Sequence, residues 1–261
     1  MNMMEMLRRR MAKLSPEWRK AFSKFQANRF RRVQYLVHRT LFGSDLCRLA
    51  VVNNTDKWGL HSHAQYYQTH FAPLRRKRLN LLEIGIGGYD DPQIGGGSLR
   101  MWRTYFPRAQ VYGIDIHDKS AHDERRIKTF RGSQVDFAFL NRALEEIGPV
   151  HIIIDDGSHL NEHVIKTFEY LFPRLATPGI YAIEDTQTAY WKKYGGASTC
   201  LNQADTSMGF LKRLVDGINF RYFDVEGYQP NYYDKHIVSM HFYSNLVLVE
   251  KGENTESMRC R

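Results

Sequence analysis

Hydrophobic positions from residue 79 onward alternate between short continuous runs and helical spacing. The continuous runs predict five buried strands, at residues 81–85, 110–115, 127–131, 150–154 and 180–183. The helical spacing predicts helices between and after them, at residues 98–105, 141–147, 163–175 and 210–219. Ser98 follows three glycines and is expected to cap the first of these helices. Alternating strands and helices imply an α/β fold whose parallel sheet is covered on both faces.

The two ends of the chain follow other patterns. Residues 220–225 and 239–250 read as a closing β pair. Residues 1–50 carry aromatic and aliphatic side chains at helical spacing between Arg and Lys, beginning at Trp18 and Phe22. We therefore expect a basic helical N-terminal extension over residues 1–50 and one domain over residues 51–261.

The positive charge of the chain belongs to this extension. The first 50 residues hold 12 basic and 3 acidic side chains, while the rest of the chain balances at 25 of each. Such an arm could bind a membrane surface or nucleic acid. A helix that packs on the body or on a partner subunit is favoured, because amphipathic patterns are common in packed helices. No nucleic-acid-binding motif appears, so no nucleic-acid partner is expected.

The cysteine content and the lack of long apolar runs bear on where the protein is located in the cell. Cys47, Cys200 and Cys260 are few and widely spaced, which is typical of a reducing environment and not of a disulfide framework. No apolar run approaches the ~20 residues of a membrane span, and the basic N-terminus lacks the apolar segment of a signal peptide. These features predict a cytoplasmic protein.

Two of the predicted strands end in adjacent acids. Asp155 and Asp156 follow one strand, and Glu184 and Asp185 follow the next. Carboxyl ends of parallel strands share one edge of a sheet, so these acids and His159 are expected to lie close together. Carboxylate oxygens suit Mg²⁺ or a similar cation. A histidine beside such an ion is a candidate general base.

A glycine-rich turn follows the first strand. Glu83 precedes Gly85 and Gly87, but the dinucleotide fingerprint would need glycine where this chain has Asp90. Asp115 ends the second strand, where a carboxylate can accept hydrogen bonds from ribose hydroxyls. This layout fits S-adenosylmethionine better than NAD, because the former has no pyrophosphate for the turn to hold.

Beyond these patterns, residues 50–252 resemble the metal-dependent sugar O-methyltransferases of macrolide deoxysugar and mycobacterial glycolipid biosynthesis. The matching segments lie at residues 55–61, 82–88, 96–102, 112–115, 155–159, 184–186, 194–196 and 241–243. The resemblance implies a class I S-adenosylmethionine-dependent methyltransferase Rossmann-like fold, with a mostly parallel seven-stranded sheet. It also implies a homo-oligomer that methylates a hydroxyl of a glycoside, glycolipid or polysaccharide.

The resemblance further assigns roles to individual residues. Mg²⁺ would be ligated by Asp156, Glu184 and Asp185, and His159 would be the base. The implied contacts of S-adenosylmethionine are with Thr55, Lys57, His61, Glu83, Gly85, Gly87, Asp115, Gln134, Asp136 and Asp155. The chain departs from the family pattern at Ser133 and at His63-Ala64, which bears on individual cofactor contacts.

Three other interpretations compete with this one. Zinc at His61, His63 and His70 is disfavoured, because no fourth ligand has suitable spacing. A catechol-type O-methyltransferase would share the fold and the metal, but that family uses a lysine base where this chain offers His159. A non-catalytic module that docks through its basic arm would not require the metal and base residues.

Overall fold

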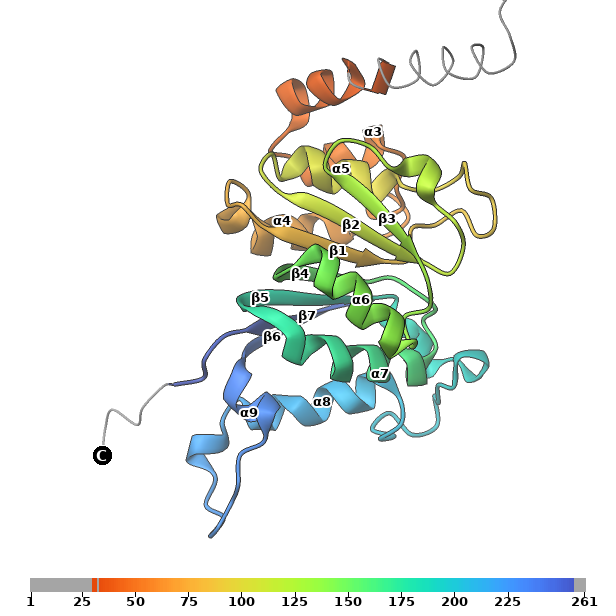
Figure 1. Cartoon of the computed structure of the whole chain (residues 1–261). Helices are drawn as coiled ribbons and strands as arrows, with labels where there is room; N and C mark the ends of the chain where they lie inside the picture. Colours follow the sequence, from red (N-terminus) through yellow and green to blue (C-terminus); the bar gives the residue numbers. More distant parts are fainter. Residues whose placement is uncertain (1–29, 32, 256–261) are drawn as a thin grey trace, which may run out of the picture.

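The computed structural model describes residues 30–31 and 33–255, and Figure 1 shows a central sheet between two layers of helices. The strands are β1 (Asn80–Ile84), β2 (Gln110–Asp115), β3 (Ile127–Arg131), β4 (Val150–Asp155), β5 (Leu175–Glu184), β6 (Ile237–Tyr243) and β7 (Leu246–Lys251). They are arranged in the order β3-β2-β1-β4-β5-β7-β6. β1 to β5 pair in parallel, whereas β7 runs antiparallel to both β5 and β6. The expected mostly parallel, seven-stranded sheet is confirmed.

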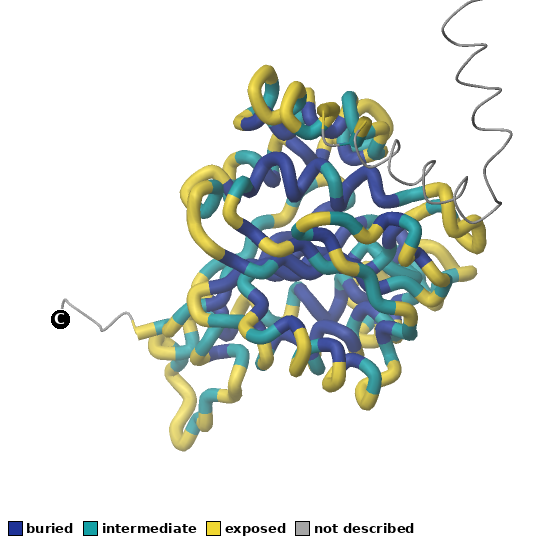
Figure 2. Tube along the Cα trace, turned by 45° about the horizontal axis from the view of Figure 1, so that its top comes forward, coloured by how far each residue is buried: buried dark blue, intermediate teal, exposed yellow. Residues whose placement is uncertain are grey.

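Alternating apolar side chains on the strands divide the core into two halves. On one face Leu81 and Ile152 pack with α3 (Leu46–Val52), α4 (His63–Phe71) and α5 (Gly97–Tyr105). The opposite face packs against α6 (Phe137–Ile147), α7 (Asn161–Leu171), α8 (Ser207–Gly217) and α9 (Tyr232–His236). Burial on both faces explains why the strands read as continuous apolar runs in the sequence. Figure 2 shows the buried sheet beneath more exposed outer helix faces.

Two expected features differ from the structure. Gly96 is the N-terminal cap residue of α5, and the Ser98 hydroxyl donates to Glu83 instead of capping the helix. The closing β pair is wrong as placed, because Phe220–Tyr222 is a 3₁₀ turn. The pair is instead a hairpin of β6 and β7, both of which lie within residues 237–251.

The expected boundary at residue 50 falls inside α3. Leu46, Leu49 and Ala50 are completely buried in the same half of the core as Trp102, so α3 is part of the body. Residues 33–42 are helical and lie before it, and the Tyr35 hydroxyl accepts a hydrogen bond from Arg126 (3.0 Å). The remainder of the expected extension, residues 1–29, lies outside the described residues. No described helix has both the length and the apolar character that crossing a membrane requires.

Candidate active site

The two acid pairs meet at the carboxyl ends of neighbouring strands. β4 and β5 pair in parallel, with Asp155 opposite Ile183, which sets Asp156 and Glu184 next to each other where the strands end. Asp185 and His159 follow in left-handed backbone conformations, with φ of 53° and 57°. Residues other than glycine rarely adopt such backbone angles, and residues with strained backbones are often found at functional sites.

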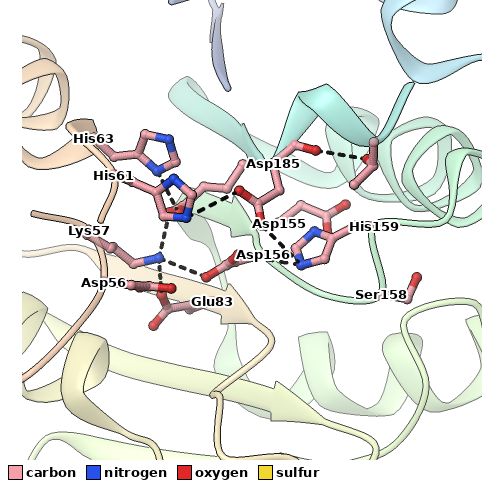
Figure 3. Close-up of polar contacts among 12 residues, drawn as sticks. Asp56, Lys57, His61, His63, Glu83, Asp155, Asp156, Ser158, His159 and Asp185 are labelled. Atoms are coloured by element: carbon pink, nitrogen blue, oxygen red, sulfur yellow. Dashed lines mark hydrogen bonds and ion pairs between the residues drawn. The ribbon is translucent and has the colours of Figure 1, made fainter. Parts of the chain in front are cut away.

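Three of the expected residues converge on one point. Asp156, His159 and Asp185 each offer one ligand atom, and these atoms all lie within 4.8 Å of one another. The His159 Nε2 atom is 3.9 Å from Asp156 Oδ1 and 3.7 Å from Asp185 Oδ2. Figure 3 shows both carboxylates and the imidazole turned toward this point, while Ser158 points away.

A divalent cation fits this arrangement. The Asp185 Oδ1 atom is buried and accepts no hydrogen bond from any residue within 30–31 or 33–255; its nearest cationic candidate is His61 Nε2, at 3.7 Å. A buried carboxylate oxygen without a donor is costly. An ion held by carboxylate oxygens would remove that cost, and such oxygens are the ligands that Mg²⁺ prefers.

Glu184 has different surroundings from the other acids. It is 4% exposed, and its Oε1 atom accepts from Lys57 Nζ (2.6 Å) and from the Tyr67 hydroxyl (2.7 Å). Its Oε2 atom lies 2.9 Å from His63 Nδ1. An ionised carboxylate offers about four lone-pair directions, so these three contacts leave about one of them for an ion.

A fully buried lysine links the acids from three strands. Lys57 Nζ contacts Asp156 Oδ2 (2.9 Å) and Glu184 Oε1 (2.6 Å), and it lies 3.3 Å from Glu83 Oε1 at the end of β1. Figure 3 shows Lys57 entering this cluster from the segment before α4. The resemblance placed Lys57 at the cofactor, whereas its ammonium group lies among the carboxylates.

Burial and charge act in opposite directions on the pKa values of these groups. Burial alone would lower the pKa of Lys57, but Asp156, Glu184 and Glu83 raise it well above its ordinary value. Burial would raise the pKa of Glu184, yet Lys57 and His63 hold it below its usual range. Burial lowers the pKa of His159, against the opposite effect of Asp185 and Glu184. Charge therefore outweighs burial in setting the pKa of Lys57 and of Glu184, whereas burial outweighs charge in setting the pKa of His159.

The turn after β1 lies directly against the Asp156 backbone. Gly85 has a φ of 85°, and a Cβ atom there would lie 2.0 Å from the Asp156 carbonyl oxygen. Only glycine allows this approach. Asp115 fixes the other side of the turn, because its Oδ2 atom accepts from the Ile86 backbone N–H (3.0 Å). Gly87, the next glycine of the turn, also has a positive φ, of 76°.

Two residues expected at the cofactor direct their side chains into the protein. Gln134 donates from Nε2 to Asp155 Oδ1 (3.1 Å) and to Thr167, and its Oε1 atom accepts from the Ser158 backbone N–H (2.8 Å). Asp155 is 2% exposed, and its second oxygen lies 3.4 Å from the Tyr181 hydroxyl. These internal contacts mean that both residues support the turn that carries Asp156 and His159. Their expected proximity to the cofactor stays a prediction.

The other expected cofactor residues belong to two separate segments of the chain. Thr55 and His61 are in the segment before α4, and the His61 ring stacks on His63 with centroids 4.8 Å apart. Asp136 caps α6 by accepting from the Phe139 backbone N–H (3.0 Å). Its carboxylate therefore has a structural role that the sequence pattern did not indicate.

Sequence reasoning missed the two residues of α4 that contact Glu184. His63 was noted as a departure from the family pattern and as a disfavoured zinc ligand, and Tyr67 was not singled out. Both are nearly or fully buried, four residues apart on one face of a helix that was not predicted. A buried polar residue on such a face is a signal for a site, but only when the helix itself is recognised.

Comparisons with known proteins place the fold in a class. No protein-family model matches the chain. The structure of the MycE methyltransferase from the mycinamycin biosynthetic pathway, in complex with Mg and SAH, superposes with a TM-score of 0.78. It is 46% identical, and the match covers 81% of this chain and 55% of that chain. The fold is the class I S-adenosylmethionine-dependent methyltransferase Rossmann-like fold, as expected.

Curated relatives make the resemblance more specific. The chain is 47% identical over 211 residues to 8-demethyl-8-alpha-L-rhamnosyl tetracenomycin-C 2'-O-methyltransferase of Streptomyces olivaceus. It is 46% identical over 214 residues to mycinamicin VI 2''-O-methyltransferase of Micromonospora griseorubida. The matches cover 80% and 81% of this chain, but only 55% and 54% of the relatives. The resemblance to sugar O-methyltransferases is confirmed, and the chain spans about half the length of these relatives.

Proposed function

We propose that this protein is an S-adenosylmethionine- and Mg²⁺-dependent O-methyltransferase that acts on a sugar hydroxyl of a glycosylated small molecule. The convergence of Asp156, Asp185 and His159 carries the proposal, because it joins a cation site to a candidate base. The similarity to enzymes that are named for methylating sugars on tetracenomycin and mycinamicin supports this class of acceptor.

Asp156, Glu184 and Asp185 would hold the ion. Asp185 has the free buried oxygen, Asp156 lies beside it, and Glu184 has a remaining lone-pair direction. When bound, Mg²⁺ would act as a Lewis acid on the acceptor hydroxyl, and S-adenosylmethionine would supply an activated methyl group. Gly85 would let the turn that binds the cofactor pack against the Asp156 backbone, and Asp115 would hold that turn in position.

His159 would accept the proton of the acceptor hydroxyl at Nε2. This atom faces Asp156 and Asp185, so the two carboxylates would orient the ring and stabilise it once it is protonated. A neutral imidazole is the form that can take a proton, and the lowered pKa of His159 favours that form. General-base assistance of this kind is typically worth ~10²–10⁴-fold in rate.

The electrostatics of Lys57 disfavour the catechol-type alternative. A lysine base must lose its proton near neutral pH, but three carboxylates raise the pKa of Lys57 well above its ordinary value. Lys57 therefore supports the acids as a fixed cation. We extend the proposal to a cytoplasmic homo-oligomer, and we include glycolipid and polysaccharide acceptors as the wider class. The basic arm would pack on the body or touch a membrane surface.

Transfer of a labelled methyl group tests this function. We would offer three acceptors, namely a glycosylated polyketide, its aglycone and a polysaccharide, each with and without EDTA and with Mg²⁺ restored. We expect methyl transfer to the glycosylated polyketide or to the polysaccharide, but not to the aglycone. This transfer should be lost on chelation and regained when Mg²⁺ is restored. Equal transfer to the aglycone would contradict the sugar acceptor, and activity that survives thorough chelation would contradict the metal.

A further inference from the structure

A second group of side chains that could bind a metal ion lies beside the C-terminal end of α4. His70 is near the end of this helix, His241 is on β6 and Glu250 is on β7. Each offers one ligand atom, and these atoms lie within 4.8 Å of one another. We propose that His70, His241 and Glu250 form a binding site for a structural Zn²⁺ ion, separate from the proposed magnesium site.

The spacing of the three ligand atoms is close to what zinc requires. His70 Nδ1 lies 3.1 Å from Glu250 Oε1, and His241 Nε2 lies 3.6 Å from the same oxygen. In a tetrahedral zinc site with bonds of about 2.05 Å, ligand atoms are about 3.3 Å apart. These two separations fall on either side of that value, and the His70 and His241 ligand atoms lie within 4.8 Å of each other. Side-chain movements would therefore bring all three atoms to an ion.

The chemistry of the ligands selects zinc over magnesium. Two imidazoles and one carboxylate suit Zn²⁺, whereas Mg²⁺ prefers oxygen ligands. Burial, followed by the neighbouring His70, lowers the pKa of His241, which keeps that ring in the neutral form that binds metals. The three ligands would carry a net negative charge, and water would complete the tetrahedron because Glu250 and His241 are both 35% exposed as side chains.

The second ring nitrogen of His70 is already held in place. Its Nε2 atom lies 2.9 Å from the Tyr243 hydroxyl, and the Tyr243 ring stacks on Tyr66 with centroids 3.9 Å apart. Metal-binding histidines commonly make such a contact through the nitrogen that does not bind the ion, which fixes the ring orientation. Binding would replace two contacts, the one between His70 Nδ1 and Glu250 Oε1 (3.1 Å) and the one between His241 Nε2 and the Ser239 hydroxyl (3.1 Å). That hydroxyl can rotate toward water.

The proposed ion would join α4 to the antiparallel end of the sheet. The same helix carries His63 and Tyr67, which contact Glu184. An ion at His70 would fix the end of the helix one turn beyond Tyr67, and would therefore hold both residues in position. The role is structural, because none of the three ligands is among the residues assigned to methyl transfer.

Zinc titration of the full chain tests the site. The protein would be stripped with EDTA, dialysed into excess Mg²⁺ to fill the magnesium site, and titrated with ZnCl₂ by calorimetry. We expect one Zn²⁺ per chain and a higher Tm with zinc than without it, because an ion that binds only the folded state stabilises it. His241→Ala and Glu250→Gln should each weaken zinc binding by more than about 100-fold, and Tyr243→Phe by about 10- to 100-fold.

Two controls separate this site from its alternatives. His236→Ala removes a half-buried histidine at the end of α9 that lies outside the cluster, and it should leave zinc binding unchanged. The double variant Asp156→Asn/Asp185→Asn should also retain the ion. Circular dichroism would confirm that each variant is folded. The proposal is overturned if the wild-type chain binds no zinc or if His241→Ala still binds it. It is also overturned if the double variant loses zinc binding.

Discussion

Lys57 and Glu184 form a buried ion pair, with 2.6 Å between Nζ and Oε1 and side-chain exposures of 1% and 3%. The lysine comes from the segment before α4 and the glutamate from the end of β5, so the pair ties the N-terminal part of the body to the sheet. Removing one partner from such a pair is strongly destabilising, because an uncompensated charge stays buried.

Lys57→Met is therefore expected to lower the free energy of unfolding by about 3–5 kcal/mol. Adding Glu184→Gln should recover part of that loss, since the second change removes one of the three carboxylates that Lys57 contacts. Urea unfolding in EDTA measures both variants. Lys128→Met is the matched control, because Lys128 and Glu146 form an exposed pair, and such pairs contribute about 0–1 kcal/mol. An equal effect at the two lysines would contradict the buried pair.

His159→Ala should reduce turnover by about 10²–10⁴-fold while Mg²⁺ affinity is retained. The reason is that the imidazole accepts the proton but is not among the three proposed ligands. Kinetics and Mg²⁺ calorimetry on the same samples separate the two effects. His163→Ala is the control, because this histidine contacts Ser158 and not the acids. Unchanged turnover in His159→Ala would remove the residue from this role.

The pH dependence of turnover gives an independent test of the base. Burial lowers the pKa of His159 from its ordinary value of 6.5, and the neutral ring is the active form. Turnover should therefore stay level through neutral pH and fall only as the pH drops below about 6.5. This acid limb should disappear in the residual activity of His159→Ala. A midpoint above pH 7 would show that another group is the base.

Asp185→Asn should weaken Mg²⁺ binding by about 10- to 100-fold or more, because it replaces a charged ligand by a neutral one of the same shape. Calorimetry with MgCl₂ measures the affinity directly, without an acceptor. Asp205→Asn changes an exposed acid and serves as the control for net charge. Equal affinities in the wild type and Asp185→Asn would place the ion elsewhere.

The sequence predicted the strands better than the helix that completes the site. Buried parallel strands have continuous apolar runs, whereas α4 has polar side chains on its buried face, where His63 and Tyr67 contact Glu184. Its apolar spacing was therefore weak. The β6–β7 hairpin was missed because its turn is only two residues long, with Asn245 at a φ of 59°. The acid pairs were found because strand ends follow directly from the strand pattern.

Other features of the site could not come from a sequence pattern. The contacts of Lys57 with three acids join residues 26 to 127 positions away along the chain, and no local spacing predicts them. The inward orientation of Asp155 depends on Gln134 and Tyr181, which lie on other elements. Adjacent acids therefore indicated where a cation could bind, but not which acid would face it.

Gly85→Ala should abolish cofactor binding, because the added Cβ would lie 2.0 Å from the Asp156 carbonyl oxygen and would displace the turn or the β4 end. Gly195→Ala is the matched control. Its φ is also positive, at 76°, but the nearest atom to the added Cβ is 4.0 Å away, so only backbone strain of about 1 kcal/mol is expected. Binding of SAH, measured by calorimetry, distinguishes the two. Normal affinity in Gly85→Ala would show that the turn does not contact the cofactor.

Asp155→Asn should stabilise the protein at high pH. Burial raises the pKa of Asp155 from 3.8 to about 7, so the folded state holds a proton that the unfolded chain releases. Between these pH values the native state binds more protons, and the stability of the wild type therefore falls as the pH rises, by up to about 4 kcal/mol. Asparagine can keep the contacts with Gln134 and Tyr181 without a charge. Unfolding in EDTA should show the variant to be more stable at pH 8 and equal at pH 4. A difference that does not depend on pH would show that Asp155 is ionised throughout.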